Sequence, residues 1–208
     1  MDGETATRLT DWRRRVFAMY QDARAHTKDD PAAAWSRWRR ARDGLFAEHP
    51  QSPLPVDRRA SFAGLAYFAY DPSCRVAGEV LPAEPQPLDI AASTGDPIAF
   101  SRVATCAFAL YGARRTLDLY WLEGYGGGLF LPFRDETSGG ETYGAGRYLL
   151  DTVKGADLGS DDRGRLVLDF NFAYNPSCAY DPIWSCPLAL PANHLAVAVR
   201  AGERTPSL

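Results

Sequence analysis

The stretch that decides the fold is residues 98–128, IAFSRVATCAFALYGARRTLDLYWLEGYGGG, where aromatic and β-branched residues run up to glycines. It predicts a β-hairpin with Ile98–Tyr111 as its first strand, Thr116–Leu122 as its second and Arg114–Arg115 at the tip. Apolar and polar residues alternate in the second strand, as expected when one face of a strand is wet. Gly126–Gly128 predict a sharp loop and lack the strand–loop–helix context of a dinucleotide site.

The chain after Pro55 follows the same pattern of short strand-like runs separated by Gly, Pro, Asp and Asn. Regular short strands with turn signals between them favour an antiparallel β-barrel or a sandwich. The further predicted strands are Phe62–Tyr70, Arg75–Leu81, Leu88–Ala91, Leu129–Pro132, Arg147–Thr152, Arg165–Asp169 and Leu195–Ala201.

Two helices are predicted ahead of the strands. Apolar residues recur at helical spacing over residues 9–23, with Thr10 or Asp11 as the cap, and again over residues 35–46. Asp30 is a good N-cap for the second helix, and Pro31 suits its first turn. The expected fold class is therefore α+β and mainly β, with two N-terminal helices packed on an antiparallel β-barrel or sandwich. Residues 1–30 are expected to be a helical extension and residues 31–208 a single β-rich domain.

Seven arginines lie in these two helices, beside several aspartates. They could bind an anionic partner, but the acidic neighbours favour a solvated helix face on which long side chains cover apolar surface. The seven are Arg13, Arg14, Arg15, Arg37, Arg39, Arg40 and Arg42.

Composition limits the function classes. The formal net charge of -3 argues against a general nucleic-acid binder, which is normally strongly basic. No apolar run is long enough for a membrane span, and the polar, Arg-rich first 20 residues do not resemble a secretory signal. The sequence thus predicts no nucleic-acid partner, no membrane partner and a cytoplasmic location.

The cysteines and histidines do not define a catalytic or metal centre. Cys178 and Cys186 are separated by seven residues, which fits neither a thioredoxin-like pair nor a zinc knuckle. With His194 they offer too few ligands for the usual metal set, so no metal site is predicted, although a disulfide or metal clip at the two cysteines stays as a weaker alternative. No Gly-x-Ser-x-Gly elbow is present, and catalytic residues and cofactor stay unassigned.

Two polar segments could carry a ligand site. Residues 134–148 combine carboxylates, hydroxyls and arginines with four glycines, and residues 168–187 are dense in Asp, Asn and Tyr. Such loops can surround a small molecule, and Arg147 could clamp an anionic group on it. The predicted ligand-binding residues are Asp135, Ser138, Glu141, Thr142, Tyr143, Arg147, Asp169, Asn171, Tyr174 and Asn175.

The sequence leaves open whether the chain is an enzyme. In an enzyme, Glu141 or Asp135 would act as the general base while Arg147 orients the anionic group. The alternative is a non-catalytic interaction or structural module whose Trp-rich helices pack on a partner or, in a homo-oligomer, on a second subunit.

Both segments also resemble a known family. Residues 135–148, DETSGGETYGAGRY, and residues 169–176, DFNFAYNP, resemble the central and C-terminal signatures of domain-of-unknown-function family 1684, a bacterial family. Residues 49–54 and 62–65 resemble its opening. The resemblance carries over no activity, but it implies that the two late motifs meet in space as one site. Phe172 and His194 stand where the family often has a basic residue, which removes charge from that site.

Overall fold

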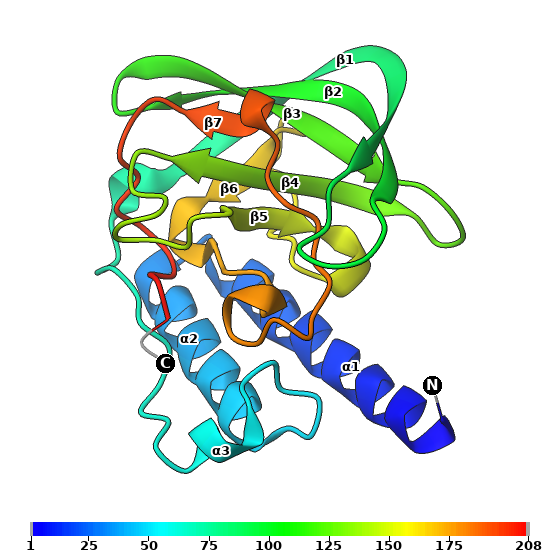
Figure 1. The fold of residues 1–208 in the computed structure, drawn as a ribbon. Helices are drawn as coiled ribbons and strands as arrows, with labels where there is room; N and C mark the ends of the chain where they lie inside the picture. The colour runs from blue at the N-terminus through cyan, green and yellow to red at the C-terminus, as the bar shows by residue number, and fades with distance from the viewer. Residues whose placement is uncertain (1, 207–208) are drawn as a thin grey trace.

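The computed structural model of the protein describes residues 2–206 (Figure 1). The chain begins with two helices that form a hairpin. Helix α1 (Gly3–His26) begins at Asp2, whose carboxylate accepts from the backbone N–H of Thr5 at 2.7 Å. The predicted start at Thr10 or Asp11 is therefore wrong. The first turns of α1 are mostly exposed, so no apolar stripe could mark them in the sequence.

Helix α2 (Pro31–Glu48) begins as predicted. The Asp30 carboxylate caps it by accepting from the N–H of Ala33 at 2.9 Å, and Pro31 occupies the first turn. A short helix α3 (Val56–Arg59) follows the hairpin. None of the described helices is both long and apolar enough to cross a membrane.

The rest of the chain is a nearly closed antiparallel β-barrel, so the mainly-β fold with two N-terminal helices is confirmed. The strand order is β5-β4-β3-β2-β1-β6, and β7 pairs in parallel with β4. The two end strands of this order, β5 and β6, do not pair, but Tyr148 of β5 forms a bridge with Tyr174, which follows β6. This bridge narrows the gap between the two end strands. The strands are β1 (Arg75–Ile90), β2 (Ile98–Leu110), β3 (Ala113–Leu122), β4 (Gly128–Asp135), β5 (Arg147–Asp151), β6 (Leu166–Asp169) and β7 (His194–Leu195).

The central hairpin forms between β2 and β3, but its tip differs from the prediction. Leu110 pairs with Ala113, so Tyr111 and Gly112 make the turn, while Arg114–Arg115 lie in β3. Both turn residues have positive φ, 51° at Tyr111 and 74° at Gly112, as the tight turns of two-residue hairpins require. Tyrosine seldom adopts this conformation, which is why the sequence did not mark the tip there.

Four other strand predictions change. Arg75–Leu81 and Leu88–Ala91 are parts of one long strand, β1, with a register shift between Pro82 and Gln86. Phe62–Tyr70 is irregular, with one bridge at Tyr67 rather than a strand, and the predicted Leu195–Ala201 strand stops at Leu195. In both segments, isolated backbone hydrogen bonds to neighbouring loops take the place of a regular strand ladder.

The two largest of the three buried hydrophobic clusters lie inside the barrel and between the barrel and the helices. Leu, Phe and Cys side chains fill the barrel interior, and the helical hairpin packs aromatic side chains onto the outside of the sheet. Trp38 of α2 lies against Phe172, with ring centroids 5.0 Å apart. Trp35 donates its ring N–H to the carbonyl of Asn171 at 2.7 Å. Loops and helices thus meet the barrel at this contact, where the candidate site lies.

Candidate functional site between the helical hairpin and the barrel

Arg147 and Asp135 form a buried ion pair at one end of the barrel. The Arg147 guanidinium is 1% exposed and donates to Asp135 Oδ2 at 2.7 Å. It also donates to the carbonyls of Val199 (3.1 Å), Ala201 and Glu203 (3.2 Å). Burial lowers the pKa of Arg147, and the facing carboxylate opposes that shift. The pair therefore fixes the C-terminal segment, residues 199–204, against the barrel.

The loop after β4 closes around the same carboxylate. Asp135 Oδ1 accepts from the backbone N–H and the hydroxyl of Thr137, at 2.7 and 2.5 Å. The hydroxyls of Thr137 and Thr142 are 2.8 Å apart, and Ser138 Oγ accepts from the N–H of Asp135. The structure thus gathers four predicted site residues, Asp135, Ser138, Thr142 and Arg147, into one cluster held by bonds within the protein.

Asp169 and Asn171 form a second cluster. Asp169 Oδ1 accepts from the backbone and side-chain amides of Asn171, at 3.0 and 2.8 Å, and Oδ2 lies 3.3 Å from Arg75. The Asn171 side chain bonds both backbone groups of Asp71. Burial raises the pKa of the Asp169 carboxyl, against these hydrogen bonds and Arg75. The two residues join the end of β6 to the segment before β1.

Two predicted residues lie apart from these clusters. Glu141 pairs on the surface with Arg200, with a nitrogen–oxygen distance of 2.9 Å and side chains 39% and 63% exposed respectively. The Tyr143 hydroxyl is 3.7 Å from the sulfur of Cys178. This contact and the Tyr148–Tyr174 bridge bring the two polar segments together at their edges.

A second buried ion pair, Arg42–Glu203, was missed by the sequence interpretation. Arg42 Nη2 lies 3.2 Å from Glu203 Oε2, with side chains 9% and 1% exposed. Glu203 also accepts from the backbone N–H of Asn175 at 2.7 Å and from the hydroxyl of Tyr180. Burial works to lower the pKa of Arg42, but Glu203 and the nearby tyrosines raise it further, so the guanidinium stays charged.

The expectation that Arg42 lies on a solvated helix face is wrong. It follows Trp38 by four positions and Trp35 by seven, so it lies on the apolar stripe of α2. Its guanidinium carbon lies 4.6 Å from the ring centroid of Phe46 and 5.1 Å from that of Tyr174. An arginine in register with two tryptophans was the signal that the sequence did offer.

A small cavity of about 50 Å³ lies beside Arg42. Tyr174 and Asn175, two of the predicted ligand-binding residues, line it. Arg42 Nε, the Tyr174 hydroxyl and Asn175 Oδ1 are buried and have no hydrogen-bond partner among the described residues. The Asn175 amide is oriented by a 2.8 Å bond from Nδ2 to the carbonyl of Arg204, which leaves Oδ1 free to accept.

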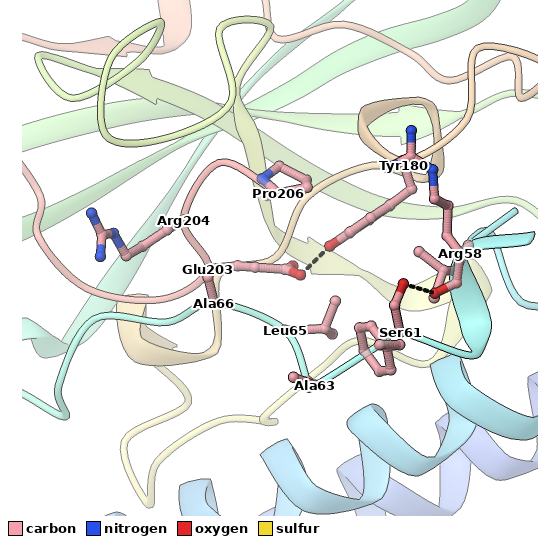
Figure 2. A pocket seen from close by; sticks show the side chains of 12 residues that line it. Arg58, Ser61, Ala63, Leu65, Ala66, Tyr180, Glu203, Arg204 and Pro206 are labelled. Atoms are coloured by element: carbon pink, nitrogen blue, oxygen red, sulfur yellow. Dashed lines mark hydrogen bonds between the residues drawn. The ribbon is translucent and has the colours of Figure 1, made fainter. Parts of the chain in front are cut away.

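A larger pocket of about 280 Å³ lies on the Glu203 side of the pair (Figure 2). Residues 61–66 form one wall, and Tyr180, Glu203 and Arg204 form another. Figure 2 shows the Tyr180 hydroxyl directed at the Glu203 carboxylate. The two buried polar side chains of this pocket therefore satisfy each other, in contrast to those of the small cavity.

No metal centre is found within residues 2–206, where no three His, Cys, Asp or Glu side chains are arranged to hold an ion. The fold and this site define a class of protein: a helical hairpin on a nearly closed antiparallel barrel, with a buried arginine–carboxylate pair at their junction. The chain belongs to the family described as protein of unknown function, DUF1684, whose profile matches residues 60–204.

One solved structure is similar over most of the chain. It is the solution NMR structure of an uncharacterized protein of Haloarcula marismortui, 39% identical, with a TM-score of 0.61. The similarity covers 86% of this chain and 96% of the other. No curated protein is significantly similar to the chain.

Proposed function

We propose that this protein binds a small anionic molecule in the cavity beside Arg42, at the junction of the helical hairpin and the barrel. The observation that carries the proposal is that three residues lining this one cavity each carry a buried polar atom without a partner among the described residues. Leaving a buried polar group unpaired costs about 1–3 kcal/mol. A polar ligand that bonds all three groups would recover that cost.

The chemistry of the three atoms defines the ligand. Arg42 Nε donates from a charged group, and the Tyr174 hydroxyl can donate to the same anion. Lys154 also lines the cavity and adds positive charge. Asn175 Oδ1 can only accept, so the ligand also carries a hydroxyl or amine donor beside its anionic group.

The size of the cavity restricts the ligand further. A water molecule needs roughly 10–15 Å³ of such space, so about 50 Å³ holds only a few non-hydrogen atoms. A short hydroxycarboxylate fits both the volume and the donor–acceptor pattern. Binding is the proposed activity, and no reaction is assigned to it.

The larger pocket of Figure 2 gives weaker support for a ligand. Its volume is near the lower limit of ordinary ligand pockets, roughly 300 Å³. Glu203 and Tyr180 already bond each other and Glu203 also binds Arg42, so a ligand there would have to compete with partners in the protein.

The test is a titration with sodium glycolate, with sodium acetate as the probe that lacks the hydroxyl donor. We expect glycolate to shift the NMR signals of the Arg42 side chain and the Asn175 backbone, and acetate to bind more weakly. Tyr174→Phe removes one donor to the anion and should weaken glycolate binding by roughly tenfold or more.

Tyr125→Phe is the matched control, because this tyrosine is fully exposed and should leave the affinity unchanged. Equal glycolate affinity in the Tyr174→Phe variant and the parent protein would contradict the proposal. Shifts confined to other regions of the molecule, or no shifts at millimolar glycolate, would do the same.

A further inference from the structure

Cys178 and Cys186 form a thiol pair that the proposed ligand site does not use. Cys178 lies in a 3-10 turn, Ser177–Ala179, and Cys186 ends the loop that follows. The two side chains lie within hydrogen-bonding reach of each other, and both are free thiols. Cys186 is 3% exposed, whereas Cys178 is only partly buried. Cys178 is thus the more exposed residue of the pair and Cys186 the more protected one.

Hydrogen bonds hold this loop in place. The Ser93 hydroxyl accepts from the N–H of Cys186 at 3.1 Å and donates to the carbonyl of Trp184 at 2.9 Å. The backbone N–H of Ser93 donates to the carbonyl of Cys186 at 2.9 Å. These bonds to the β1–β2 connection fix Cys186 next to Cys178.

The surroundings of Cys178 favour its thiolate. The Cys186 thiol and the Tyr143 hydroxyl are both placed to donate to its sulfur, and they lower its pKa although burial opposes the shift. The same interaction raises the pKa of Cys186. By contrast, burial raises the pKa values of Cys74 and Cys106 to about 11, which makes them poor nucleophiles at neutral pH.

We propose that Cys178 and Cys186 are a peroxide-responsive pair, in which Cys178 attacks the oxidant and Cys186 closes a reversible disulfide. The Cys178 thiolate attacks one oxygen of hydrogen peroxide, the O–O bond breaks, and the released hydroxide takes a proton to become water. Cys178 is then a sulfenic acid.

The second step forms the S–S bond. The Cys186 sulfur attacks the sulfenic sulfur, the S–O bond breaks, and the departing hydroxide leaves as water with the thiol proton. The two thiols together lose two electrons and two protons, and the peroxide is reduced to two waters. The site lies beside the proposed ligand cavity, because Ser177 of the same turn lines that cavity.

The test treats the reduced, full-length protein with one equivalent of hydrogen peroxide at pH 7 and measures intact mass and peptide masses. We expect a loss of about 2 mass units, a Cys178–Cys186 cross-link, and full return of both thiols with dithiothreitol. Cys74 and Cys106 should stay reduced and serve as internal controls. Four free thiols after treatment, or oxidation first at Cys74 or Cys106, would overturn the proposal.

Two variants test the order of the steps. Cys186→Ser should stop at a Cys178 sulfenic acid that dimedone traps, and Cys178→Ser should leave Cys186 reduced under the same treatment. Oxidation of Cys186 in the Cys178→Ser variant at the parental rate would show that Cys178 is not the attacking thiol. The result for the parent protein does not depend on how well either variant folds.

Discussion

The two buried arginine–carboxylate pairs in this chain differ in what surrounds them. Around Arg147 and Asp135, the neighbouring hydroxyls and carbonyls are bonded to the pair or to each other. Around Arg42 and Glu203, the acid is surrounded by donors, while Arg42 Nε, the Tyr174 hydroxyl and Asn175 Oδ1 are buried without a hydrogen-bond partner among the described residues. Both pairs involve residues 199–204. We call the fully hydrogen-bonded Arg147–Asp135 pair the closed pair, and the Arg42–Glu203 pair, whose neighbours include unpaired atoms, the open pair.

The difference separates structural polarity from polarity that is available to a ligand. A buried charge is costly unless it is paired and hydrogen-bonded, and the Arg147 cluster meets that condition within the protein. In the Arg42 cluster the charges are paired, but three buried polar atoms have no hydrogen-bond partner among the described residues. Burial and charge alone would mark both as sites, and it is the unpaired atoms that distinguish the second.

The largest expected effect is on the closed pair. Arg147→Met removes the guanidinium and leaves Asp135 buried without its charge partner, so we expect a loss of about 3–5 kcal/mol in the free energy of unfolding. Urea denaturation measures it. Arg134→Met makes the same substitution at an exposed position one residue before Asp135 and should change stability by less than about 0.5 kcal/mol. Similar losses in the two variants would show that the pair does not stabilise the fold.

The segment shared by the two pairs is the next to test. Gly202 has φ +77°, and an added Cβ would lie 2.6 Å from the carbonyl oxygen of Phe170. We expect Gly202→Ala to cost about 3 kcal/mol, from left-handed backbone strain and the clash together. Gly112→Ala has a similar φ of +74° with nothing within 4 Å, and it should cost only about 1 kcal/mol in thermal or urea unfolding. Equal costs would mean that the close approach at Gly202 relaxes freely.

Two tyrosines next to the open pair should differ in how much they contribute to the free energy of unfolding, and both effects should be smaller than those above. Tyr180→Phe removes a hydroxyl that donates to Glu203 and should cost about 2 kcal/mol. Tyr174→Phe removes a buried hydroxyl without a partner, so in ligand-free protein its stability should stay within about 0.5 kcal/mol of the parent or rise. Chemical denaturation distinguishes them. A large loss in Tyr174→Phe would reveal a bond to this hydroxyl and remove the basis of the open pair.

The smallest effect is expected at the surface pair of Glu141 and Arg200. Both side chains are more than a third exposed, so solvent screens the attraction and Glu141→Gln should cost at most about 0.5 kcal/mol. Thermal unfolding at low and high salt would check this, since the small difference should vanish at high salt. A loss above 2 kcal/mol would instead give Glu141 a structural role.

The sequence predicted those parts of the molecule that depend on neighbouring residues. The Asp30 cap of α2 rests on a contact three positions away, and the β2–β3 hairpin pairs two strands that are consecutive in the sequence; both form. Tyr174 and Asn175 were selected because they lie in a segment dense in Tyr and Asn, and both residues line a cavity, while ligand binding by them stays a prediction. The tip at Tyr111 was missed because that tyrosine adopts a backbone conformation rare for its type.

What the sequence could not predict depends on distant partners. Arg42 and Glu203 are 161 positions apart, and only the closed barrel brings them together. Asp135 and Arg147 looked like ligand-binding groups because their types and spacing suit an anion. The partners of Arg147 include the backbone carbonyls of residues 199, 201 and 203, which carry no side-chain signature.

The late position of Glu203 has a consequence for the order of folding. The helical hairpin is built from local contacts and can form early, but Arg42 and the tryptophans beside it then face water or one another until residues 199–204 dock. Closure of the barrel and neutralisation of the buried guanidinium are therefore one late, non-local event. We expect the slowest step of folding there, because non-local contacts form late, and tryptophan fluorescence would follow it.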